Sequence, residues 1–137
     1  MSAVGYQYVV LRCVPRVDRE EFVNVGVVLY CQARDVLLAA THVDADRLRA
    51  LAPALDQAAV VDALTAVSDV CRGAAAAGLA GAAPIGTRFG YLAAPRSTVV
   101  QPGPIHGGVT ADPERERDWL LARYVEGSDG VPPHASP

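Results

Sequence analysis

The sequence contains no lysine, and its 12 basic residues are all arginine, against 15 acidic residues. The net charge is -3, and the isoelectric point is about 5.5. No dense run of arginines offers the basic stripe that nucleic-acid-binding proteins use, so the composition argues against binding to DNA or RNA.

Long apolar runs are also missing from the sequence. Nothing approaches the roughly 18 uninterrupted apolar residues of a membrane span. The beginning of the chain does not place basic residues ahead of an apolar stretch, as a secretory signal would. We therefore expect a cytoplasmic protein with no membrane segment.

The spacing that metal sites and disulfide frameworks require is absent as well. The cysteines are few and far apart: Cys13, Cys31 and Cys71. An odd number at wide spacing forms neither a disulfide framework nor a Cys-x-x-Cys motif, which fits a reducing compartment. The histidines are equally scattered. We expect no metal and no cofactor.

What is present fits one folded domain, because 137 residues with 51% hydrophobic side chains can bury a core. Valine-rich and aromatic runs predict strands at residues 6–14, 21–30, 36–41, 87–94 and 98–101. Aspartates ahead of apolar stripes predict three helices: one that Asp44 or Asp46 caps and that ends at residue 51, and two at residues 56–78 and 112–124. The small side chains of residues 79–86 predict a loop.

The order of these elements predicts an α+β fold. Short connections between the first three strands favour an antiparallel meander. We expect an antiparallel sheet of four to five strands with two to three helices packed on one face. Residues 1–126 would form this single α+β domain, and the Gly-, Ser- and Pro-rich residues 127–137 would form a disordered tail.

The least ordinary surface is the 95–108 segment, which contains three prolines and three glycines. Prolines stiffen a backbone and glycines let another group approach it closely. Stiff loops that carry polar side chains often form binding sites. This segment carries Arg96, Ser97, Thr98, Gln101 and His106. Alternatively, its prolines only shape a crossover.

Arg96, with Ser97 and Thr98 beside it, could hold a phosphate or carboxylate, because a guanidinium and two hydroxyls suit such an anion. The alternative is a structural bond from Arg96 to Glu21 or to the carbonyls at a helix end. An imidazole such as that of His106 suits acid–base catalysis, but no nucleophile is visibly paired with it, so no catalytic residue is assigned.

A second feature is the strand that contains Phe22, Asn24 and Gly26, which are expected to share one face. An unpaired buried amide costs about 1–3 kcal/mol, so Asn24 needs a partner. Gly26 leaves room for another backbone or a ligand. We predict that Asn24 and Gly26 receive the 95–108 segment. Arg12 and Arg16 could add positive charge to the same edge, or they could simply be solvated.

Together these motifs resemble a bacterial family, domain of unknown function 3037. The resemblance rests on residues 8–12, 21–27 and 94–102, with His106 and the pair Asp112 and Pro113. It implies no established activity. It does imply a protein partner, because members are often encoded beside a HipA-like kinase. The sequence departs from the family pattern at Gly103, where the pattern has serine, and in the two glycines after His106.

Two functions stay open from the sequence. The first is an accessory binding domain that acts through a protein partner such as a HipA-like kinase. The second is a small enzyme or ligand-binding domain for an anionic, phosphorylated small molecule. Its site would use the 95–108 segment, with Arg12 and Asn24 beside it. An open sheet edge would also allow homo-oligomerisation.

Overall fold

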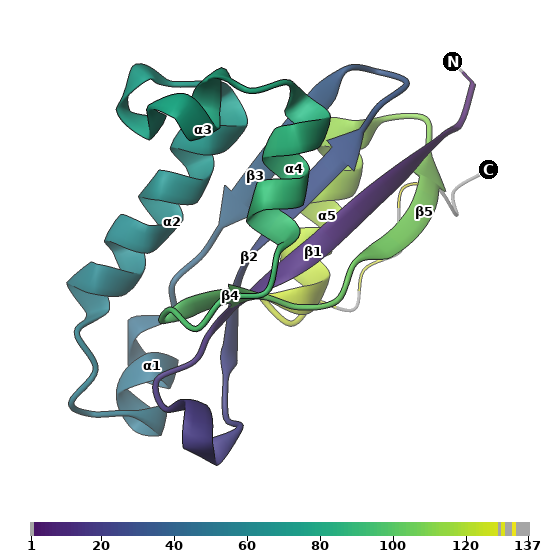
Figure 1. Ribbon diagram of the computed structural model, residues 1–137. Helices are drawn as coiled ribbons and strands as arrows, with labels where there is room; N and C mark the ends of the chain where they lie inside the picture. The colour runs from purple at the N-terminus through teal and green to yellow at the C-terminus, as the bar shows by residue number, and fades with distance from the viewer. Residues whose placement is uncertain (1, 129, 131–132, 134–137) are drawn as a thin grey trace.

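The computed structural model describes residues 2–128, 130 and 133. Of the predicted tail, residues 129, 131–132 and 134–137 lie outside the described residues. The described chain forms one antiparallel sheet in the order β3-β2-β1-β4, and β5 also pairs with β1 (Figure 1). The strands are β1 (Val4–Cys13), β2 (Val23–Cys31), β3 (Val36–Thr41), β4 (Val100–Pro102) and β5 (His106–Thr110).

Helices cover both faces of this sheet (Figure 1). The helices are α1 (Ala45–Leu51), α2 (Gln57–Arg72), α3 (Leu79–Ala82), α4 (Ile85–Ala93) and α5 (Pro113–Tyr124). Two 3-10 turns, η1 (Val17–Arg19) and η2 (Ala75–Ala77), complete the described elements. The predicted α+β class is confirmed. One face packs against α1, α2 and α4, and α5 covers the other face, which the sequence did not predict.

The two cores follow from the alternation of side chains along β1. Val9, Leu11 and Cys13 point into the larger core with α2 and α4. Tyr8 and Val10 point the opposite way, into the core that α5 closes. Because both sets are apolar, the strand must be covered on both faces.

The 95–108 segment contributes a broken edge strand. β4 pairs with Leu11–Cys13 of β1, and β5 pairs with the earlier part of the same edge. Pro102 ends β4 and Pro104 lies in the break before β5, where a missing N–H costs little at a sheet edge. The N–H of Gly103 still donates to Val10 O at 2.8 Å. The predicted docking of this segment on Asn24 and Gly26 is therefore wrong, because its partner is β1, not β2.

Three helices begin as predicted, each at an aspartate that caps it. The side chains of Asp44, Asp56 and Asp112 each accept a bond from a backbone N–H in the first turn of α1, α2 and α5. Such caps contribute about 1 kcal/mol each. α2 ends earlier than predicted, at Gly73, whose φ of 67° is the left-handed conformation that favours glycine.

The predicted strand at residues 87–94 is wrong, because this stretch is helix α4. The pattern of Phe89 and Tyr91, two residues apart, suggested a strand face. In the structure Phe89 is buried and stacks on Tyr30 with ring centroids 5.3 Å apart, whereas Tyr91 is exposed. Phe89 and Leu92 form the buried side of the helix at a three-residue step. The predicted loop before it contains α3.

The two consecutive glycines of β5 have different surroundings. A Cβ on Gly108 would lie 2.6 Å from the Tyr6 hydroxyl oxygen, whereas a Cβ on Gly107 would meet nothing closer than 3.6 Å. Tyr6 cannot easily move aside, because it is buried beneath α5 next to the fully buried Glu116. Burial, and then the negative charge of Glu116 and a hydrogen bond with it, raise the pKa of the Tyr6 phenol.

We expect Gly108→Ala to destabilise the fold by about 1–3 kcal/mol, because the new methyl group overpacks the core around Tyr6. Gly107→Ala is the matched control and should change the free energy of unfolding by less than about 0.5 kcal/mol. Urea denaturation of both variants measures the difference. Equal stabilities would contradict this account of the β5–α5 packing.

Candidate functional site

Three of the predicted site residues lie in one row across three strands. Arg12 on β1 is directly opposite Asn24 on β2 and directly opposite Gln101 on β4. A bulge in the β1–β2 pairing next to Arg12 turns Asn24 to the α5 face, away from the face of Gly26. Asn24 Nδ2 then donates to the carbonyl of Tyr124 at 2.9 Å, so the amide secures the end of α5.

The guanidinium of Arg12 is held between two surfaces. Its Cζ lies 4.2 Å from the ring centroid of Phe22. On Gly103, a Cβ would come within 3.2 Å of Cζ, Nε and Nη2 of Arg12, so the missing side chain leaves room for the cation. Arg12 Nε is buried without a hydrogen-bond partner among the described residues. The absence of a side chain at residue 103 thus coincides with a close approach by Arg12.

Gln101 and His106 complete this face of the sheet. Gln101 Nε2 donates to Thr98 O at 2.9 Å. His106 is exposed and lies over Tyr8, with ring centroids 5.3 Å apart. The Tyr8 and Tyr124 hydroxyls are 3.2 Å apart, and burial followed by this hydrogen bond raises the pKa of Tyr8. The arrangement is an aromatic stack at the rim of the α5 core.

Arg96, Ser97 and Thr98 are not part of the Arg12 row. Arg96 donates to the carbonyls of Ala94 and Tyr91, and its Cζ lies 4.9 Å from the Tyr91 ring centroid. It therefore caps the C-terminal end of α4, which is one of the two interpretations that the sequence left open. Thr98 Oγ1 donates to Val100 O at 2.8 Å, and Ser97 is exposed.

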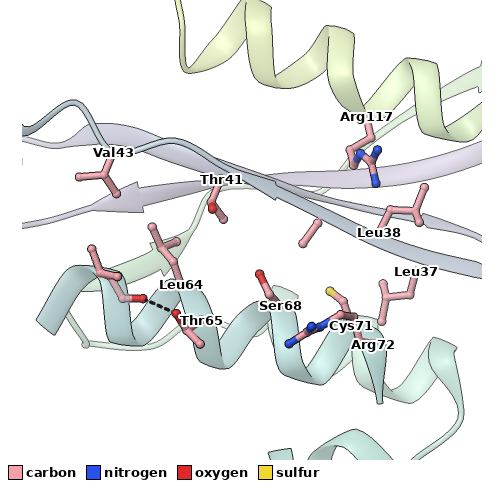
Figure 2. Close-up of a pocket in the computed structure, with 12 residues that line it drawn as sticks. Leu37, Leu38, Thr41, Val43, Leu64, Thr65, Ser68, Cys71, Arg72 and Arg117 are labelled. Carbon is pink, nitrogen blue, oxygen red and sulfur yellow. Dashed lines mark hydrogen bonds between the residues drawn. The ribbon is translucent and has the colours of Figure 1, made fainter. Parts of the chain in front are cut away.

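Sequence reasoning missed a groove of about 480 Å³ along the edge of the sheet (Figure 2). Its floor and walls come from β3 and α2, and one side chain, Arg117, reaches it from α5. The residues that line it are Leu37, Leu38, Ala39, Thr41, Val43, Val61, Leu64, Thr65, Ser68, Cys71, Arg72 and Arg117. The groove lies along β3, at the edge of the sheet opposite the one that the 95–108 segment forms.

The outer edge of β3 is unpaired beside this groove. His42 N donates to Val25 O at 2.9 Å. In an antiparallel pair, every second residue bonds to the neighbouring strand, so the backbone groups of residues 36, 38 and 40 face β2. Leu37, Ala39 and Thr41 must direct their N–H and C=O groups away from β2. No other strand of the described chain accepts these groups.

The two edges of the sheet differ in how well they are protected. Edge strands are commonly blunted by charge, proline or a break. The edge formed by β4 and β5 has prolines and an interruption, but β3 has neither a charged residue nor a proline in its six residues. The absence of charge and proline is visible in the sequence of residues 36–41, and it is the signal that could have predicted a binding edge there.

The groove offers binding surface, but its polar side chains do not form a catalytic pair. Burial raises the pKa of Cys71 to about 12, although nearby Arg88 opposes the shift, so the thiol is protonated at neutral pH. Thr65 Oγ1 donates to Val61 O at 3.0 Å and is engaged within its own helix. Among the described residues, no group of three or more His, Cys, Asp or Glu residues could hold a metal ion.

Fold and site together define a small α+β domain with helices on both faces of its sheet, an unprotected edge strand and a groove beside it. In the described residues, no helix has the length and apolar character needed to cross a membrane. Residues 8–125 match the model of the family described as "Protein of unknown function (DUF3037)", so the chain belongs to this family, and the resemblance seen in the sequence is confirmed. No curated protein and no solved structure gives a significant match.

We expect the thiols of the native protein to react slowly with a disulfide reagent such as DTNB, because Cys13, Cys31 and Cys71 are all buried. For Cys71, a pKa near 12 leaves about a thousandfold fewer thiolates than an ordinary cysteine has. Val61→Cys, at an exposed position of the groove, is the positive control and should react at once. Fast modification of the native wild-type chain would contradict the burial of these three thiols.

Proposed function

We propose that this chain is an accessory domain that binds a partner protein by adding an extended segment of the partner to β3. The observation that carries the proposal is the free edge of β3, with outward backbone groups at Leu37, Ala39 and Thr41 beside a groove that both apolar and polar side chains line. Strand addition supplies affinity through main-chain hydrogen bonds and specificity through side-chain pockets.

A HipA-like kinase is the first partner to test, because the family resemblance implies one. The proposal places both proteins in the cytoplasm. The three free and buried cysteines fit that reducing compartment.

We expect Ala39→Pro to abolish co-purification with the partner, because proline removes an outward N–H at the centre of the free edge. Ala45→Pro is the matched control: it places proline at the first position of α1, where the N–H has no helical partner and proline is favoured. Val61→Glu, which puts a charge into the exposed side of the groove, serves as a second test if Ala39→Pro does not fold.

Co-expression and affinity purification compare these variants with the wild-type chain. A folded Ala39→Pro variant that binds as well as the wild type would contradict strand addition. Absence of any complex between the wild-type chain and the kinase would exclude this partner.

The second candidate function is binding of an anionic, phosphorylated small molecule at Arg12. One observation favours it: the guanidinium is held in place by Phe22 and Gly103, yet makes no hydrogen bond or ion pair with the described residues. The neighbouring polar groups support it less, because the amide nitrogens of Asn24 and Gln101 already donate to carbonyls of this chain.

A thermal-shift screen of phosphorylated metabolites tests this second function. A true ligand should raise the melting temperature of the wild-type chain. At a concentration a hundredfold above its Kd, binding adds about 2.7 kcal/mol to the free energy of unfolding. The shift should vanish in Arg12→Gln and persist in Arg96→Gln, whose guanidinium caps α4. If no compound shifts the wild-type chain, or if Arg12→Gln responds equally, Arg12 is not an anion site.

A further inference from the structure

The groove beside β3 is chemically polarised along its length (Figure 2). Val43 and Leu64 lie at one end, near Thr41, and Val61 precedes Leu64 by about one turn of α2. Arg72 and Arg117 lie at the other end, near Leu37 and Leu38. An extended chain in the groove would therefore meet apolar side chains at one end and cations at the other.

The two arginines approach β3 from opposite faces of the sheet. Arg72 comes from α2, in the layer with α1 and α4, and Arg117 comes from α5 on the other face. Successive side chains of a strand also point to opposite faces. Two neighbouring residues of an added strand would thus face one arginine each.

Both guanidinium groups keep donors for a bound carboxylate. Arg72 Nη2 donates to Asp69, and Arg117 Nε donates to Asp118 Oδ1 at 2.9 Å. An arginine has five N–H donors, and within the described residues each of these two uses a single nitrogen for a carboxylate. Each pair joins one exposed side chain to one that is largely shielded: Arg72 is 68% and Asp69 16% exposed, and Asp118 is 66% and Arg117 24% exposed. The N–H groups that these pairs do not use stay available for a bound carboxylate.

We infer that the groove receives an extended segment of another protein that carries two adjacent acidic residues at one end. This inference rests on the strand addition proposed above and adds the sequence pattern of the segment that binds. The acidic residue of the bound segment that faces Arg72 would point to the same face of the sheet as Leu37. Because every second residue of a strand shares a face, the residues of the segment two and four positions away from it, towards Thr41, would also face α2. Those positions would be apolar, because they reach towards Leu64, Val61 and Val43.

A second copy of this chain fits the groove less well. β3 itself contains no acidic residue, so a copy of β3 paired with this edge would leave both arginines without a carboxylate from the partner strand. The missing carboxylate favours a different protein as the occupant.

The test uses fluorescent synthetic peptides and the full chain. One peptide, Val-Thr-Val-Thr-Glu-Glu, has the inferred pattern for one strand direction, and Glu-Glu-Thr-Val-Thr-Val has it for the other. In the control peptides lysines replace the two glutamates. We expect at least one glutamate peptide to bind about tenfold or more tightly than its lysine control by fluorescence anisotropy. Equal binding of glutamate and lysine peptides, or no binding by either order, would overturn the inference.

Variants of the protein then locate the contact. Arg72→Glu combined with Arg117→Glu should remove the preference for glutamate. Arg16→Glu combined with Arg49→Glu is the matched control, because it makes the same change in net charge at two arginines that are exposed, paired with an aspartate and outside the groove. If this control weakened binding as much as Arg72→Glu combined with Arg117→Glu, the effect would be one of net charge, and the inference would fail.

The Ala39→Pro variant separates this inference from the proposed function. If Ala39→Pro abolishes partner binding while the arginine variants do not, strand addition stands and the acidic pattern is wrong. If a folded Ala39→Pro variant binds both partner and peptide normally, strand addition itself is wrong. Sedimentation of the wild-type chain provides the last outcome: a dimer that Ala39→Pro dissociates would replace the acidic segment with a second copy.

Discussion

The pairing of β1 along both of its edges is the constraint on which the other elements depend. β2 bonds to one edge, and β4 and β5 share the other. Alternate side chains of β1 enter two separate cores, so helices are required on both faces. Because β1 takes up the chain between residues 100 and 110, no described segment is left to pair with the outer edge of β3.

Local signals in the sequence predicted much of this fold. The aspartate caps, the strand at residues 36–41 and the α+β class follow from short-range chemistry, and the structure confirms them. Helix α4 could not be recognised in the same way, because Phe89 and Tyr91 alternate like strand residues while the buried contact of Phe89 is with Tyr30, far away in sequence. The placement of α5 on the opposite face likewise depends on tertiary packing.

The candidate site shows the same division between local and long-range information. Sequence reasoning selected Arg12, Asn24 and Gln101, but their alignment depends on the bulge beside Arg12 and on a pairing between residues almost 90 positions apart. It grouped Arg96 with them only because of its place in the 95–108 segment. The groove beside β3 combines residues from three elements, which no short motif reveals.

The free edge of β3 also bears on the order of synthesis. During translation the β1–β2–β3 meander leaves the ribosome well before residues 100–110, which cover the second edge of β1. For that interval the nascent sheet presents two largely apolar edge strands, β1 and β3, to its surroundings, and such edges pair readily with other chains. Later folding closes the edge of β1 but leaves that of β3 exposed. A partner that binds β3 early would therefore also cover an edge that the rest of the described chain never closes.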